Sequence, residues 1–127
     1  MKKTIIKPTK SPRAIGPYNQ AVKTDHFIYT AGQIPIDPKT NQMILGDITV
    51  QTKQVLTNLK NLIEESGSSL DKVVKCTVFL KNMNDFAGMN AVYAEYFKAE
   101  TAPARSTIEV ARIPKDALVE IEAVAIV

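Results

Sequence analysis

Apolar residues recur along this chain with two different periods, which separate predicted helices from predicted strands. Over residues 49–65 they return every three or four positions, which predicts an amphipathic helix. Asp47 or Thr49 can cap its start, and Gly67 supplies a left-handed stop. The apolar stripe of this helix consists of Val55, Leu56, Leu59, Leu62 and Ile63.

A second helical stripe predicts a helix over residues 85–98, with Asn82 or Asn84 at its start. Gly88 lies inside it and indicates close packing, because glycine is costly in a helix interior. Asn90 falls on the apolar side, so its amide needs a hydrogen-bond partner. The apolar members of the stripe are Phe86, Met89, Tyr93, Tyr96 and Phe97.

The remaining apolar runs are short and rich in β-branched residues, which is typical of strands. Residues 73–80 are almost continuously apolar or β-branched, which predicts a central strand. Residues 20–23 and 27–31 predict a hairpin. Shorter strands are predicted over 4–7 and 43–45, and the two longest C-terminal runs, 106–113 and 118–127, flank a Pro-Lys-Asp turn.

Alternation in the last run places two carboxylates, Glu120 and Glu122, on the face opposite Val119 and Ile121. A carboxylate in such an apolar strand loses solvation unless it meets a partner, water or a subunit edge. Arg105, fixed by Pro103 before the preceding strand, is the nearest candidate cation. The pattern alone more often describes surface charges on a half-wet sheet.

The order of strands, helix, strand, helix and two strands predicts an α+β fold. Both crossover helices are expected on one face of a mixed sheet, and residues 1–127 are expected to form a single domain. If the last two strands formed a simple hairpin, Glu120 and Arg105 would lie roughly 17 Å apart. Either these strands are not adjacent in that register, or a site shared by both residues uses two subunits.

Composition is that of an ordinary globular protein, with 45% hydrophobic and 23% charged residues. The net charge of +3 is too diffuse to predict a nucleic-acid groove. The single cysteine excludes an internal disulfide. No apolar run suits a membrane span and no signal-peptide pattern opens the chain, so we expect a cytoplasmic protein, with a mitochondrial location left open.

The lone histidine, His26, lies in a predicted hairpin loop, so a histidine-based triad lacks its proton carrier. Cys76 falls within the predicted central strand, where cysteine is usually a small apolar residue. No metal-ligand spacing and no glycine-rich nucleotide loop occur, so we expect neither a metal nor a cofactor. What remains is Arg105, which can clamp a carboxylate, and a glutamate that can position water.

Several ordered motifs make the whole chain resemble the Rid/YjgF family of reactive intermediate deaminases. They are Ala14-Ile-Gly-Pro-Tyr18, Ala31-Gly-Gln-Ile-Pro35, Gln51-Thr-Lys-Gln-Val55, Met83-Asn-Asp-Phe86, Asn90 with Tyr93, Pro103-Ala-Arg-Ser106, Glu109-Val-Ala-Arg-Ile-Pro-Lys-Asp116 and Glu120-Ile-Glu-Ala123. The resemblance implies a chorismate-mutase-like fold, assembled as a homotrimer with ligand clefts between subunits.

The resemblance also implies a role for each matching position. Arg105 and Glu120 would be catalytic, with Arg105 binding the substrate carboxylate and Glu120 activating water. The other substrate-binding positions would be Tyr18, Gly32, Asn90 and Thr107. Two residues depart from the common family pattern: Ala31 replaces a frequent serine, and Thr107 a frequent cysteine.

The resemblance implies hydrolytic deamination of 2-iminobutanoate and 2-iminopropanoate. Besides other copies of the chain, the expected partners are small imino and 2-oxo acids; neither nucleic acid nor a membrane is expected. An endoribonuclease or translation inhibitor is the first alternative, which the basic pI of about 9.0 mildly favours. A trimer that senses a small ligand without turnover is the second alternative, because Ala31 and Thr107 reduce the polarity of the site.

Overall fold

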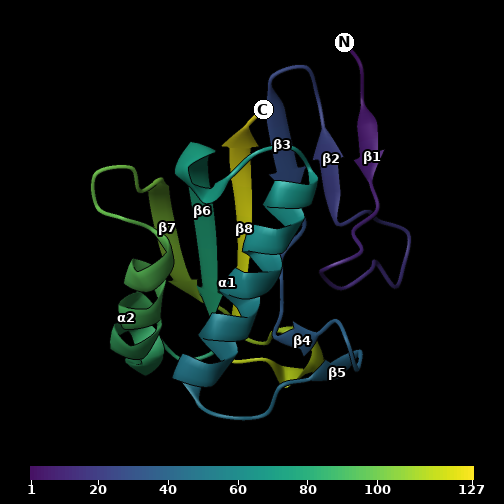
Figure 1. Ribbon diagram of the computed structural model, residues 1–127. Helices are drawn as coiled ribbons and strands as arrows, with labels where there is room; N and C mark the ends of the chain where they lie inside the picture. Colours follow the sequence, from purple (N-terminus) through teal and green to yellow (C-terminus); the bar gives the residue numbers. More distant parts are fainter.

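The computed structural model describes residues 1–127, folded as one six-stranded sheet with both helices on the same face (Figure 1). The strand order is β1-β2-β3-β8-β6-β7, and a separate two-stranded ribbon pairs β4 with β5. This confirms the expected α+β class. The strands are β1 (Thr4–Ile6), β2 (Ala21–Lys23), β3 (Phe27–Thr30), β4 (Ile36–Asp37), β5 (Gln42–Met43), β6 (Val73–Leu80), β7 (Ala104–Glu109) and β8 (Val119–Ile126); the helices are α1 (Ile48–Glu65) and α2 (Phe86–Tyr96).

The two C-terminal strands are not neighbours, so a simple hairpin of β7 with β8 is wrong. β7 pairs only with β6, in parallel, while β8 lies antiparallel between β3 and β6. The cause is α2, which crosses over the sheet from the end of β6 and returns the chain parallel to it. The first of the two alternatives left open by the sequence, strands that are not adjacent, is therefore observed.

Both helices begin and end close to where the sequence predicts. The Asp47 side chain accepts a hydrogen bond from the Val50 amide at 3.0 Å, and Gly67 adopts a left-handed φ of 92° after α1. α2 is shorter than predicted at both ends, because residues 83–85 form a 3₁₀ turn before it and Phe97 is already extended after it. A Cβ on Gly88 would lie 2.6 Å from Cγ2 of Ile48, so the close packing of the two helices is confirmed.

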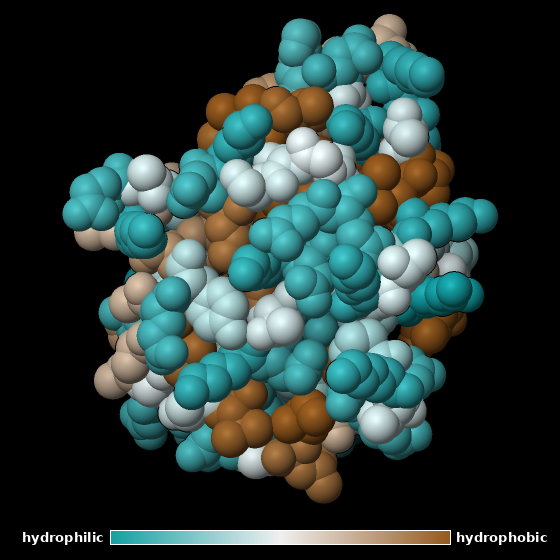
Figure 2. Space-filling model, in the orientation of Figure 1, coloured by the Kyte–Doolittle hydropathy of each residue, from teal (hydrophilic) through white to brown (hydrophobic).

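The hydrophobic core lies between the helices and the sheet. Its buried members include five α1 residues and the inward face of β8, namely Val55, Leu56, Leu59, Leu62, Ile63, Val119, Ile121, Ala123 and Ala125. The solvent face of α1 is hydrophilic (Figure 2). Neither helix combines the length and apolarity that a membrane span requires.

The other face of the sheet carries no helix (Figure 1). Side chains there alternate with the buried ones, and the well exposed apolar residues include Ile5, Phe27, Tyr29, Ile108 and Ile126. This uncovered face is called the open face below.

A buried amide on α1 fixes the segment that leaves β3. Asn58 is fully buried, and its Nδ2 donates to the carbonyl of Ile36 at 2.8 Å and more weakly to that of Ile34 at 3.4 Å. Its Oδ1 accepts from Nε2 of Gln54 at 2.9 Å. Residues 34–36 are therefore tied to α1 by one polar side chain within an apolar stripe.

Asn58→Ala is expected to destabilise the protein by about 1–3 kcal/mol, because it leaves the buried Ile36 carbonyl without its donor. Urea denaturation measures this. Asn61→Ala is the matched control, since its amide donates only to the exposed Lys10 carbonyl at 3.3 Å. Equal losses in the two variants would contradict the account.

Candidate active site

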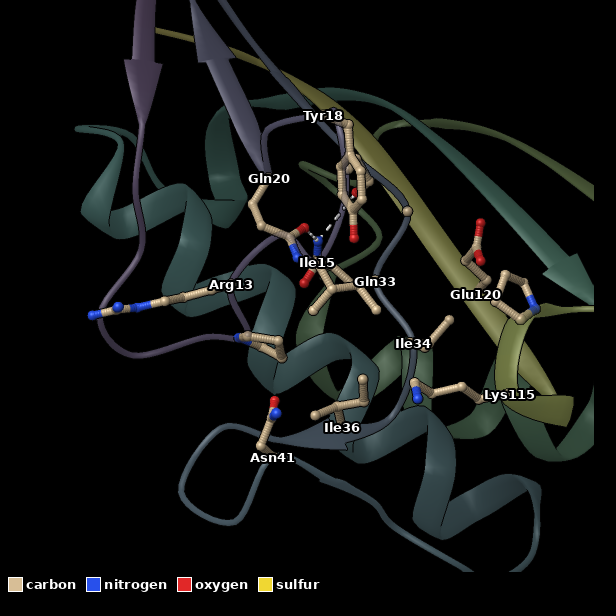
Figure 3. A pocket seen from close by; sticks show the side chains of 14 residues that line it. Arg13, Ile15, Tyr18, Gln20, Gln33, Ile34, Ile36, Asn41, Lys115 and Glu120 are labelled. Carbon is tan, nitrogen blue, oxygen red and sulfur yellow. Dashed lines mark hydrogen bonds between the residues drawn. The ribbon is translucent and has the colours of Figure 1, made fainter.

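A cavity of about 590 Å³ opens beside the start of β8 (Figure 3). It brings together Tyr18, Gly32 and Glu120, three of the residues that the sequence singled out, from three separate parts of the chain. The other lining residues are Pro12, Arg13, Ile15, Gln20, Ala31, Gln33, Ile34, Ile36, Asn41, Pro114 and Lys115.

Glu120 lies on the open face of β8, because its neighbours Val119 and Ile121 are buried in the core. Its carboxylate forms no hydrogen bond and no ion pair within the chain. Burial raises the pKa of Glu120, and the negative charge of Glu122 raises it further. A half-buried carboxylate without a partner is unusual, and it is available to water or a ligand.

Gly32 lies directly against this carboxylate. A Cβ on Gly32 would lie 2.7 Å from the carboxyl carbon of Glu120, closer than real Cβ atoms approach other atoms. A side chain at position 32 would therefore displace the Glu120 carboxylate from this place, so glycine acts here through the space it leaves and not through a left-handed backbone. The Gly32 amide has no backbone acceptor, so it is free to donate to a ligand.

Two buried glutamines hold Gly32 in place. Nε2 of Gln33 donates to Oε1 of Gln20 at 2.8 Å and to the Ala31 carbonyl at 3.2 Å. The backbone of Gln33 pairs in both directions with that of Ile121, next to Glu120. Sequence reasoning missed both glutamines, since a polar residue in a loop motif gives no sign that its side chain is buried.

Tyr18 stands at the rim on a loosely held loop. Residues 12–19 make only one backbone hydrogen bond, from the Tyr18 amide to the Gly16 carbonyl at 2.8 Å. The loop is anchored upstream by Glu65, whose carboxylate accepts from the amides of Thr9 and Lys10 at 2.8 and 2.6 Å. The Tyr18 side chain, 46% exposed, can therefore shift over the cavity at little cost.

Arg105 lies in a second cluster, on the helix-covered face of β7. Its Nη1 donates to Oδ1 of Asn90 at 2.8 Å, which supplies the partner that the Asn90 amide needed. The guanidinium also stacks on Tyr93 and Phe86, with its carbon 4.6 and 5.5 Å from the two ring centres. The three α2 residues recur at helical spacing and together fix the direction of the guanidinium.

Thr107 follows Arg105 on the same face, and its buried hydroxyl has no hydrogen-bond partner.

Beside Arg105 on β6, burial raises the pKa of the Cys76 thiol to about 11, so the thiol stays protonated near neutral pH. This agrees with the expectation that Cys76 is a structural residue. His26 is exposed in the β2–β3 hairpin, away from both clusters.

The six predicted site residues therefore form two clusters on opposite faces of one sheet. Arg105 pairs with Cys76 of β6, whereas Glu120 pairs with Phe79, three residues further along the same strand. An odd separation along a strand places side chains on opposite faces. A single copy brings Tyr18, Gly32 and Glu120 together, and separately Asn90, Arg105 and Thr107, but it does not join the two groups.

The sequence of the chain is similar to those of known proteins over almost its whole length. The family model of endoribonuclease L-PSP matches residues 8–127. A RutC family protein of Pyrococcus abyssi is 56% identical over 125 residues, covering 98% of each chain. A 2-iminobutanoate/2-iminopropanoate deaminase of Escherichia coli is 47% identical over 128 residues, covering 99% of this chain and 98% of its own.

Among solved structures, Escherichia coli TdcF with bound serine matches this fold with a TM-score of 0.91. It is 40% identical and the match covers 98% of both chains.

The raised pKa of Glu120 predicts a pH-dependent stability. A carboxyl with a higher pKa in the folded than in the unfolded protein favours folding at low pH and opposes it as pH rises through the folded-state value. Glu120→Gln should therefore raise the melting temperature at pH 7, with the gain shrinking as pH falls to about 4. Thermal denaturation across this range measures it.

Glu95→Gln, which changes an exposed carboxylate of α2, is the control and should show no such trend. A difference between Glu120→Gln and wild type that stays constant with pH would show that burial of the charge is not its cause.

Proposed function

The chain belongs to the endoribonuclease L-PSP family, the Rid/YjgF family indicated by its motifs, and we propose that it hydrolyses short 2-imino acids to 2-oxo acids and ammonia. The observation that carries the proposal is the unpaired Glu120 carboxylate beside the free Gly32 amide. A relative of 47% identity bears the name of this activity, and a related structure holds serine, a small amino acid.

Arg105 supplies the carboxylate-binding end of the proposed site. Its guanidinium is already oriented by Asn90 and two aromatic rings, so little side-chain freedom is lost when a ligand binds. A guanidinium can hold a carboxylate through two parallel hydrogen bonds, which fixes the orientation of the imino acid as well as its position. The neighbouring Thr107 hydroxyl is free to add a further contact.

Glu120 supplies the water-activating end. In the proposed reaction its carboxylate takes a proton from water as the water oxygen bonds to the imine carbon. Glu120 passes this proton to the imine nitrogen, which gives a carbinolamine. The carbinolamine then transfers its hydroxyl proton to the nitrogen and expels ammonia, which leaves the C=O bond of a 2-oxo acid. A raised pKa brings the carboxylate closer to working pH, which suits a general base. Imines of this kind already hydrolyse in water, so alignment of water and substrate is the main contribution required.

The two ends must come from different copies of the chain, because they lie on opposite faces of the sheet in one copy. We propose the homotrimer that the family resemblance implies, with its clefts between subunits. The open face supports this, since it exposes Phe27, Tyr29, Ile108 and Ile126 without any covering element. In such a cleft Arg105, Asn90 and Thr107 of one copy face Tyr18, Gly32 and Glu120 of the next.

Ala31 and Thr107 leave the catalytic pair unchanged. Ala31 lines the cavity with a methyl group where many relatives place a hydroxyl, while its backbone carbonyl still accepts from Gln33. Thr107 offers a hydroxyl in place of a thiol, and the proposed reaction forms no bond to sulfur. We expect both residues to tune substrate preference.

The cytoplasmic location of the protein stays a prediction.

Cleavage of RNA is the second candidate, and the description of the matching family model favours it. The cavity has no histidine, and its cations are Arg13 and Lys115 alone, without the aromatic interleaving that single-stranded nucleic acid usually meets. RNA cleavage that is lost in an Arg105 variant, with no imine hydrolysis by wild type, would reverse the order of the two proposals.

Arg105→Ala is expected to reduce hydrolysis of 2-iminobutanoate by about 100-fold or more, because the charge-assisted contacts to the substrate carboxylate are lost. Arg105→Lys should recover only part of the rate, since an ammonium cannot make the paired contact. A coupled assay with a PLP-dependent threonine dehydratase measures this, by following semicarbazide trapping of the transient imine.

Arg112→Ala is the matched control, because Arg112 pairs only with the exposed Asp116 at 3.0 Å. All variants should sediment like wild type, at 42 kDa if three copies of 14.0 kDa assemble. Wild-type turnover in Arg105→Ala would remove the proposed mechanism.

A further inference from the structure

We propose that Lys115 forms an anion-binding subsite at the far end of the cavity, which extends the substrate class to 2-imino acids whose side chain ends in a carboxylate. The inference rests on the proposed function for the imino-acid end of the ligand only. The distal end is argued from the cavity itself, from the backbone around Lys115, and from the charges that face it.

The cavity is larger than a four-carbon imino acid needs. Its volume of about 590 Å³ falls in the range of roughly 300–1,000 Å³ that holds drug-sized ligands. Away from Glu120 and Gly32 it continues along Ile34 and Ile36, whose side chains line the way to Lys115 (Figure 3). This apolar stretch suits methylene groups, and the polar end beyond it suits a second functional group.

A strained turn delivers Lys115 to this end. Lys115 has a φ of 58° and Asp116 a φ of 55°, a left-handed conformation that residues with a side chain adopt rarely and in succession still more rarely. The only other such residue that is not glycine is Asn41, with a φ of 59°; asparagine and aspartate adopt this conformation more readily than lysine does, so the strain lies at Lys115. Backbone strain of this kind clusters at ligand sites, where surrounding structure maintains it.

The ammonium of Lys115 has no partner within the chain. It forms no hydrogen bond or ion pair, and the one carboxylate of its own turn, Asp116, is held by Arg112 at 3.0 Å. Figure 3 shows the amino group directed toward Ile34 and Ile36, whereas the guanidinium of Arg13 points away from the cavity. Lys115 is therefore the cation available to a ligand inside it.

Lys115 does not serve as the counter-ion of Glu120. The two groups form no ion pair, and the influences on the Glu120 carboxyl come from burial and from Glu122. A ligand carboxylate beside Lys115 would gain a charge-assisted hydrogen bond without displacing any existing one.

The test compares binding of two stable 2-oxo acids of similar length, 2-oxoglutarate and 2-oxohexanoate, by isothermal titration calorimetry. Only the first ends in a second carboxylate. Wild type should bind 2-oxoglutarate roughly tenfold more tightly, the factor expected for a charge-assisted hydrogen bond partly exposed to solvent. Lys115→Met should abolish this preference, and Lys115→Arg should retain most of it.

Lys39→Met is the control, since Lys39 is exposed on the β4–β5 turn and does not line this cavity; it should keep the preference. An equal affinity of wild type for the two acids would overturn the subsite, as would a preference that survives in Lys115→Met. Because the readout is a ratio between two ligands, a general loss of folding or affinity does not imitate the result.

Turnover by wild type separates this inference from the proposed function. A Lys115-dependent preference without any hydrolysis of 2-iminobutanoate would leave the subsite standing and remove the deaminase proposal. Hydrolysis of 2-iminobutanoate without a preference for the diacid would do the reverse.

Discussion

The pleat of the sheet is the constraint on which the site depends. Side chains that are an odd number of residues apart along the register point to opposite faces, and Arg105 and Glu120 are related in this way through β6. No rotamer change can bring the two across a packed sheet. Any reaction that needs both groups therefore needs two copies of the chain, and the unpaired state of Glu120 in one copy is a direct result of that arrangement.

The two faces prepare their residues by different means. On the helix face, Arg105 is fixed by Asn90, Tyr93 and Phe86 from a single helix, so its direction is set before any ligand arrives. On the open face, Glu120 is left without a hydrogen bond and pressed against Gly32. Burial opposes its ionisation, and this loss of stability is the expected consequence of keeping a carboxylate available for chemistry.

Local elements were largely predictable from the sequence, because helix caps and apolar periodicity are local. The Asp47 cap, the Gly67 stop and the span of β6 were all predicted. Strand partners were not, since a period of two fixes the face of a strand and says nothing of its neighbour. The buried pair of Gln20 and Gln33 was missed for a related reason, since its effect depends on contacts between distant segments.

Mixing two inactive variants tests the shared site most directly. Arg105→Ala and Glu120→Gln, each lacking one half of the site, are unfolded together in equal amounts and refolded. If each site takes Arg105 from one copy and Glu120 from its neighbour, random reassortment restores about a quarter of the wild-type sites, and imine hydrolysis should return to that level. Activity that stays as low as in the separate variants, in assemblies shown to be mixed, would contradict the account.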